Sequence, residues 1–257
     1  MGFQRYVALG DSTTEGLDDH DGAGGYRGWA DRLAERIAAT QGGSLLYANL
    51  GVRGRSAREI RHEQLARAVA MRPDLATVVG GMNDLLRGDF DPVRIAGHVG
   101  EMQRALVDQG AVVVSFTLPD VSIRMPIRGA LTGRTAALNH ELRTASARSG
   151  ALLVDLSAFA VASDPRLWSA DRLHLNTEGH ARTADALAAR IAIPGVDDWW
   201  SQPLPPSGTT AAARIVEDLA WGGRYVAPWL WRRLRGRNAG DRRTAKRPEL
   251  TPVVARG

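Results

Sequence analysis

The chain has 257 residues, of which 44% are hydrophobic and 24% charged, a composition that supports a globular fold with a sizeable core. It contains no cysteine, which excludes disulfides, thiolate metal sites and a cysteine nucleophile. The net charge of +5 lies in residues 194–257, which hold 11 basic and 6 acidic side chains; the neutral remainder gives no electrostatic reason to expect nucleic acid as a partner.

No segment approaches the roughly 20 consecutive apolar residues that cross a bilayer, so the sequence predicts no membrane-spanning helix. The N-terminus runs directly into the first apolar segment, without the basic, apolar and small-residue regions of a secretory signal. We therefore expect a cytoplasmic protein.

Short apolar segments alternate with amphipathic segments from residue 6 to residue 191. The first kind predicts strands at Tyr6–Leu9, Leu45–Asn49, Leu75–Val79, Ala111–Phe116 and Ala151–Leu156. The second kind predicts helices at Trp29–Ala39, Ala57–Met71, Pro92–Gln109, Leu131–Ser149 and Thr177–Ile191. Three of the strands are almost wholly apolar, as expected of strands buried on both faces. The alternation predicts an α/β fold with a doubly wound, five-stranded parallel sheet.

Residues with chemical potential follow the predicted strands. Ser12 comes after the first strand, Gly51 after the second and Asn83 after the third, while Asp171 and His174 come just before the last helix. Ligands of doubly wound sheets bind beyond the carboxyl ends of the strands, at the switch in strand order. The sequence therefore predicts that these residues share one site.

A serine hydroxyl is a poor nucleophile at neutral pH. It attacks an acyl carbon when an imidazole takes its proton and a carboxylate orients that imidazole. Ser12, His174 and Asp171 supply these three groups, with the acid three residues before the base. The alternative for Ser12 alone is an ordinary strand-to-helix turn in which it caps a helix; Asn83 could likewise be a loop cap, and His174 a surface histidine.

Four blocks occur together in order: Gly10–Thr13, Asn49–Gly54, Gly81–Asp84 and Asp171–His180. With these blocks the chain resembles the SGNH hydrolases, also called the GDSL-type esterase/lipase family, from about residue 5 to residue 193. One departure is Thr13, where the motif that names the family has leucine.

The resemblance implies a flavodoxin-like fold and a serine esterase that works through an acyl-enzyme intermediate, with no metal and no cofactor. It implies that Ser12 is the nucleophile, His174 the base and Asp171 the orienting acid. It also implies an oxyanion hole made by the backbone N–H groups of Ser12 and Gly51 and the side-chain amide of Asn83.

Two further acids, Asp11 and Asp84, flank these positions, and we expect them to hydrogen-bond the loop backbone and hold the site rigid. The other histidines are predicted to be structural or solvent-facing: His20, His62, His98, His140 and His180.

The substrate is less well specified. Arginines in or near the predicted rim loops leave open an anionic substrate group, or simply solvated side chains: Arg53, Arg55, Arg87, Arg124 and Arg128. The loop Leu118–Gly129 mixes apolar residues with arginine and could form a wall or a lid. Because no large lid domain is inserted, we expect a small or short-chain acyl ester as substrate.

Residues 1–193 are thus predicted to be the hydrolase domain, and residues 194–257 a Trp/Arg-rich extension whose last part, from Arg237, is disordered. The extension holds five of the seven tryptophans. It could pack back on the hydrolase domain, contact a membrane surface or bind nucleic acid, and we expect the first. The alternative function is a membrane-surface or partner-binding protein whose hydrolase domain is weakly active or inactive.

Overall fold

The computed structural model describes residues 2–43, 45–120, 128–206 and 243–253, and the structural statements below concern those residues.

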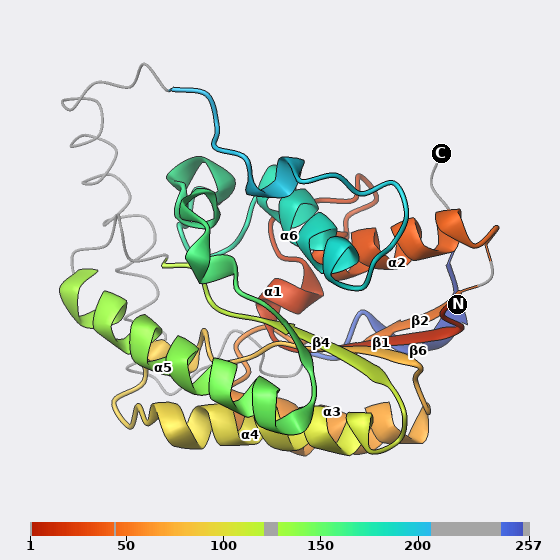
Figure 1. The fold of residues 1–257 in the computed structure, drawn as a ribbon, viewed down its shortest axis with the longest axis horizontal. Helices are drawn as coiled ribbons and strands as arrows, with labels where there is room; N and C mark the ends of the chain where they lie inside the picture. The colour runs from red at the N-terminus through yellow and green to blue at the C-terminus, as the bar shows by residue number, and fades with distance from the viewer. Residues whose placement is uncertain (1, 44, 121–127, 207–242, 254–257) are drawn as a thin grey trace.

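Six strands form one sheet in the order β5-β4-β3-β1-β2-β6. Figure 1 shows the sheet between the helices that cover it. The first five are parallel: β1 (Arg5–Leu9), β2 (Leu46–Asn49), β3 (Leu75–Val78), β4 (Val112–Phe116) and β5 (Leu152–Val154). The predicted doubly wound α/β fold is confirmed, and the order places the switch point between β1 and β3.

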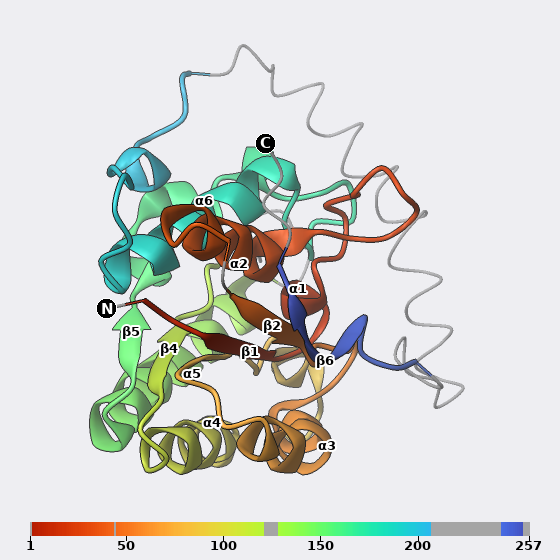
Figure 2. The ribbon, with the colours of Figure 1, turned by 90° about the vertical axis from the view of Figure 1, so that its right-hand side faces the viewer.

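Helices cover both faces of the sheet (Figure 2). One face carries α2 (Gly28–Thr40) and α6 (Thr177–Arg190); the other carries α3 (Ala57–Ala70), α4 (Pro92–Val107) and α5 (Arg128–Ser149). A single turn, α1 (Ser12–Glu15), follows β1. Short 3-10 helices cover Asp84–Leu86, Leu156–Ala158, Ala160–Ser163, Pro165–Leu167 and Trp199–Ser201.

Each face of the sheet has its own apolar core. Along β1, Val7 and Leu9 belong to the core under α3, α4 and α5, whereas Tyr6 and Ala8 belong to the core under α2 and α6. All four side chains are fully buried. Successive side chains of a strand point to opposite faces of the sheet, and helices cover both faces, which is why residues 6–9 lack the polar positions of a half-exposed strand.

The helices that flank the site begin at residues suited to that position. Ser56 and Glu59 form a capping box at α3, Asp91 precedes Pro92 at α4, and Asn176 accepts a hydrogen bond from the backbone of Gly179 at α6. These caps fix where the loops after the strands end.

The C-terminal residues correct the prediction. Arg247–Pro252, expected to be disordered, forms β6, which pairs antiparallel with β2, so the sheet has six strands rather than five. The segment is polar and contains two prolines, which an edge strand tolerates because one side of it needs no ladder hydrogen bonds. Specific contacts hold it: Lys246 Nζ bonds Asp31 Oδ2 at 2.9 Å, and the Val253 N–H bonds the Leu45 carbonyl at 2.9 Å.

The extension begins by packing back on the hydrolase domain. Trp199 Nε1 donates to Asp185 Oδ2 at 2.5 Å with Arg182 over its ring, and Trp200 stacks edge-on against Phe159. The other three tryptophans of the extension lie outside the described residues, so membrane contact through them stays a prediction. Within the part of the chain that is described, no helix has both the length and the apolar character to span a bilayer.

Candidate active site

The loop after β1 presents Ser12 at the first position of α1. Asp11, not Ser12, is the residue that caps this turn, since its Oδ1 accepts a hydrogen bond from Thr13 N at 3.0 Å. The cap interpretation of Ser12 is therefore wrong, and its hydroxyl is left for another partner. Ser12 as a whole is buried, with 7% of its surface exposed.

A buried glutamine on α3 fixes the backbone just before the serine. Gln64 Nε2 donates to Gly10 O at 2.8 Å, and Gln64 Oε1 accepts from Gly10 N at 2.9 Å. Gly10 admits no side chain, because a Cβ there would lie 2.1 Å from Thr14 Oγ1 and 3.0 Å from the Val79 carbonyl. The sequence pattern did not indicate a role for Gln64, because this residue occupies one of the regularly spaced, buried positions of α3 that are otherwise apolar.

The acid and the base sit on one loop before α6. A bridge between Trp168 and Leu175 closes the base of the loop, and the Ser169 N–H bonds the His174 carbonyl at 2.8 Å. Asp171 Oδ1 accepts from the backbone N–H groups of Leu173 at 2.9 Å and His174 at 3.0 Å. This turn is why an Asp-x-x-His spacing brings the two side chains together.

The three predicted residues form a continuous chain of hydrogen bonds. His174 Nε2 lies 2.9 Å from Ser12 Oγ, and His174 Nδ1 lies 2.5 Å from Asp171 Oδ2. The tautomer with its proton on Nδ1 donates to Asp171 and leaves Nε2 free to accept the serine proton. The arrangement can therefore generate a nucleophilic alkoxide at Ser12.

The charges around His174 favour its protonated form. Burial lowers the pKa of His174, but the hydrogen bond and charge of Asp171, with the charges of Asp18 and Asp11, raise it above its ordinary value. Burial acts to raise the pKa of Asp171, yet its bonds to His174 and Ser169 hold it well below the usual range. Asp171 therefore stays ionised over the pH range in which the ring of His174 titrates.

The three expected oxyanion donors differ in their surroundings. Gly51 N–H donates to Asn49 Oδ1 at 3.0 Å, and Asn83 Nδ2 donates to Asp11 Oδ2 and to the Arg55 carbonyl, both at 3.1 Å. These two residues thus already have acceptors within the protein. The role of all three donors stays a prediction, which for Gly51 and Asn83 requires a change of partner when substrate binds.

Packing requires a glycine at position 51, whether or not its N–H binds an oxyanion. A Cβ at this position would lie 2.7 Å from Glu15 N and 3.1 Å from the Asp11 carbonyl. The close approach is therefore between two backbone segments of the protein, the end of β2 and the serine loop.

Asp11 and Asp84 both make the kind of contact expected of them. Asp11 holds Thr13 N and the Asn83 amide, and Asp84 Oδ2 accepts from Ala57 N at 2.9 Å. Burial raises the pKa of Asp11 to about 6 and also raises that of Asp84. Asn83 precedes a 3-10 helix but makes no side-chain capping bond there; its amide donates a hydrogen bond to Asp11 instead.

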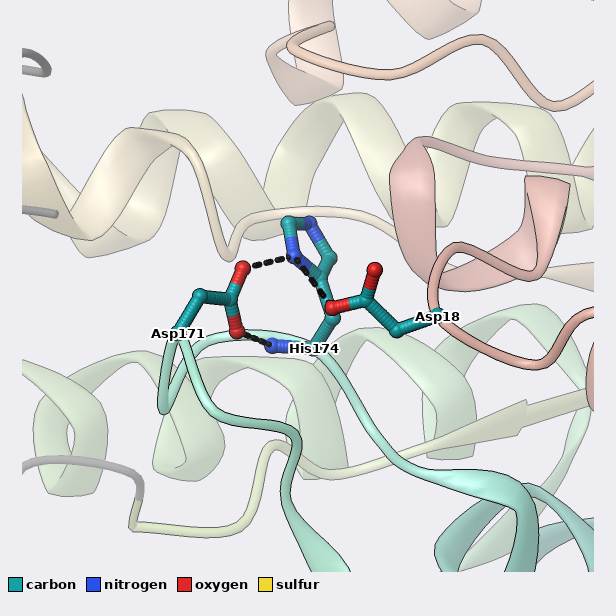
Figure 3. A group of neighbouring side chains, drawn as sticks. All are labelled: Asp18, Asp171 and His174. Atoms are coloured by element: carbon teal, nitrogen blue, oxygen red, sulfur yellow. Dashed lines mark hydrogen bonds and ion pairs between the residues drawn. The ribbon is translucent and has the colours of Figure 1, made fainter. Parts of the chain in front are cut away.

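Two residues of the site were missed by the sequence analysis. Asp18 Oδ2 lies 4.0 Å from His174 Nδ1 (Figure 3). Ser169 Oγ lies 2.6 Å from both Asp18 Oδ2 and Asp171 Oδ1. Asp18 follows α1 in a loop without periodicity, so no pattern marks it. Asp18, Asp171 and His174 are the one group among the described residues with ligand atoms close enough together to hold a metal ion, and Nδ1 of His174 is bonded to Asp171.

Most of the rim arginines are paired within the protein. Arg53 forms an ion pair with Glu15 and lies over the ring of Tyr26, and Arg55 bonds Glu63 at 2.8 Å. Arg87 lies 3.5 Å from Asp89. Arg124 and most of the predicted wall or lid, residues 121–127, lie outside the described residues. The described arginines of the rim therefore serve structure before they serve an anionic substrate.

His180 is structural, as expected. It is fully buried, its Nδ1 accepts from Trp29 N at 3.1 Å, and its Nε2 lies 3.0 Å from the Leu17 carbonyl. Burial lowers its pKa to about 4, so it is neutral at physiological pH and donates from Nε2 to Leu17. The remaining histidines lie on α3, α4, α5 and the loop after α1.

A small apolar cavity lies behind the serine loop. It is lined by Asp11 and Thr13, the neighbours of Ser12, and by apolar side chains that include Val79, Phe116 and Trp168. Its volume of about 20 Å³ has room for about one water-sized group.

Solved structures share this fold. An alpha/beta hydrolase enzyme from the metagenome of Lake Arreo, Spain, is 21% identical over 75% of this chain and 96% of its own, with a TM-score of 0.62. An acetylxylan esterase from Geobacillus stearothermophilus is 16% identical over 78% and 97%, with a TM-score of 0.60. A lipase/acylhydrolase from Enterococcus faecalis is 20% identical over 73% and 95%, with a TM-score of 0.60.

At these identities the likeness establishes the fold alone, and a comparison with curated proteins finds no match. The family comparison goes further, since residues 8–182 match the GDSL-like Lipase/Acylhydrolase family. That range is more than half of the chain and contains every residue of the hydrogen-bonded site described above. The chain therefore belongs to the GDSL-like lipase/acylhydrolase family and is a carboxylic ester hydrolase.

Proposed function

We propose that the protein is a serine esterase that cleaves small or short-chain O-acyl esters through an acyl-enzyme intermediate. The observation that carries this proposal is the unbroken hydrogen-bonded chain from Ser12 Oγ through His174 to Asp171. Asp171 is held ionised, and the neutral form of His174 presents Nε2 to the hydroxyl of Ser12.

In the first half of the reaction Ser12 Oγ attacks the ester carbonyl carbon while His174 Nε2 takes the hydroxyl proton. The carbonyl π electrons move onto oxygen, and the resulting oxyanion needs fixed donors. As the tetrahedral intermediate collapses, the carbon–oxygen bond to the alcohol breaks and His174 returns the proton to the leaving alkoxide. The acyl group then remains on Ser12.

In the second half a water molecule takes the place of the alcohol. His174 removes a proton from the water, the hydroxide attacks the acyl carbon, and Ser12 leaves with the proton from His174. Asp171 keeps the same imidazole orientation in both halves and does not itself become protonated. The cycle returns the enzyme to its starting state with one acid released.

The oxyanion donors are part of the proposal. Ser12 N–H lies at the attacking residue, whereas Gly51 N–H and the Asn83 amide would exchange Asn49 and Asp11 for the developing oxyanion.

The choice of a small acyl group follows the sequence expectation, since no large lid domain is inserted in the chain. An acetyl ester is the smallest substrate of this kind. Similarity of fold to an acetylxylan esterase is compatible with this choice. The alcohol part of the substrate is not proposed, and the cytoplasmic location expected from the sequence stays a prediction.

The test is turnover of p-nitrophenyl esters of increasing acyl length by the wild type and by Ser12→Ala. We expect the highest kcat/KM for acetate or propionate, and loss of turnover in Ser12→Ala. Ser201→Ala is the matched control, since it removes a hydroxyl from the distant 3-10 helix Trp199–Ser201. Full activity in Ser12→Ala would refute the proposed nucleophile, and a preference for long chains would refute the proposed acyl group.

A further inference from the structure

Asp18 has an unusual backbone conformation. Four described residues other than glycine have a positive φ: Asp18, Arg72, Arg172 and Ala192. Arg72 and Ala192 follow the ends of α3 and α6, where left-handed residues are common. Asp18, with φ of 67°, and Arg172 instead lie in the two loops that meet at His174. Such conformations persist where the surrounding contacts impose them, and they concentrate at functional sites.

The residues on either side of Asp18 are firmly held. The Leu17 carbonyl receives the hydrogen bond from buried His180, and the carboxylate of Asp19 binds Arg32 at 2.8 and 2.9 Å and the Gly28 N–H at 3.0 Å. Asp19 is itself 1% exposed. These contacts from α2 and α6 fix Asp18 between two anchors and hold its carboxylate toward His174.

The carboxylates of Asp18 and Asp171 lie on two sides of the same imidazole nitrogen. Figure 3 shows both aimed at His174 Nδ1, with Asp171 Oδ2 at 2.5 Å and Asp18 Oδ2 at 4.0 Å. Ser169 Oγ lies between the two acids, 2.6 Å from an oxygen of each. A hydroxyl has one proton, so it can donate to only one of the two carboxylates at a time.

Two carboxylates beside the same imidazole nitrogen interact more favourably with a positively charged ring than with a neutral one. That charge appears when His174 takes the proton of Ser12, so this cluster matches the protonated imidazole better than the neutral one. An interaction that is stronger in the transition state than in the ground state lowers the barrier.

We propose that Asp18 is a positioning residue of the esterase which, together with Ser169, stabilises the His174 imidazolium formed as Ser12 attacks. The inference rests on the proposed function. The proton moves from Ser12 Oγ to His174 Nε2 and then to the leaving oxygen. Neither carboxylate takes it, and the positive charge lies between Asp18 and Asp171 only while His174 carries the proton.

Other charged groups also act on His174. Asp171 on its own loop and Asp11 at the start of α1 both favour the imidazolium, while His180 on α6 is neutral. Because Asp18 is the more distant carboxylate and its side chain is 34% exposed, solvent reduces its share. We expect the loss of its charge to lower kcat/KM about tenfold and to move the acid limb of the pH profile down by about one unit.

The experiment compares the wild type with Asp18→Asn, Asp18→Gly and Asp108→Asn. Asparagine and glycine both accept the left-handed backbone, so neither variant strains the loop. Asp108→Asn is the control, since this exposed acid ends α4. Two readouts are used: kcat/KM for p-nitrophenyl acetate against pH, and the titration of the His174 ring followed by NMR, which needs no turnover.

We expect both Asp18 variants to titrate His174 at lower pH and to lose about tenfold in kcat/KM, with Asp108→Asn unchanged. Unaltered His174 titration in Asp18→Asn would overturn the proposal, as would full activity in Asp18→Gly or an activity loss without a shift of the acid limb. If the wild type has no esterase activity, the proposed function fails, while the NMR titration still decides whether Asp18 acts on His174.

Discussion

Gln64 offers a direct way to separate the positioning of Ser12 from general stability. Gln64→Leu keeps the volume of this buried side chain, which is 3% exposed, but removes both hydrogen bonds to Gly10. The Gly10 carbonyl keeps a second donor, Val52 N at 3.2 Å, whereas the Gly10 N–H loses its acceptor. One buried unsatisfied donor and one lost bond together cost about 2 to 4 kcal/mol of unfolding free energy.

The same change frees the backbone two residues before the nucleophile. A displacement of the reacting atom by about 1 Å can cost about 100-fold in rate, so we expect kcat to fall by that order. Urea denaturation gives the stability, and p-nitrophenyl acetate turnover at low urea gives the activity.

The matched control is Gln103→Leu on α4. Gln103 is also fully buried and makes two hydrogen bonds, to Ser146 and Ser149 of α5, far along the chain from the serine loop. We expect a similar loss of stability with little change in kcat. Equal loss of kcat in both variants, or wild-type kcat in Gln64→Leu, would refute the reasoning.

Three other outcomes follow from the site and the last strand. The neutral form of His174 is the base, and its pKa is raised above 6.5. We therefore expect kcat/KM to rise with pH through a midpoint above 6.5 and to be lost at pH values below that midpoint. A midpoint below 6.5 would contradict the contacts assigned to His174. Lys246→Met leaves the Asp31 carboxylate without its cation and should destabilise the protein by about 2 kcal/mol, a loss that Asp31→Asn in the same chain should partly restore. Amide hydrogen exchange in β6 should rise more in the single variant than in the double variant, and equal exchange in the two would contradict the role of the ion pair. Gly10→Ala should lower kcat about 100-fold, because the methyl group of the alanine would collide with Thr14. Wild-type kinetics in this variant would show that the serine loop can accommodate the methyl group without moving Ser12.

The sequence predicted the elements that make the site because they obey strong local rules. Almost wholly apolar segments such as Leu75–Val78 are typical of strands buried between two layers of helices, and the strand ends then place Ser12 and Asn83 at the switch point. The turn that joins Asp171 to His174 is local as well, since its hydrogen bonds lie within a few residues.

What the sequence could not predict depends on contacts between distant segments. β6 has no apolar period and forms because Lys246 and Val253 dock on residues from the first third of the chain. Asp18 approaches His174 because His180 and Arg32 hold its loop, and those contacts bridge up to 163 positions. The occupied amides of Gly51 and Asn83 likewise reflect neighbours brought close by folding.

The central claim is that Ser12 carries the acyl group during turnover. Rapid acid quenching of the enzyme with an acetyl ester, followed by peptide mass spectrometry, tests it most directly. We predict one acetyl group, on the peptide that contains Ser12, and its absence in Ser12→Ala. An acetyl group on another residue, or steady turnover in Ser12→Ala, would contradict the account.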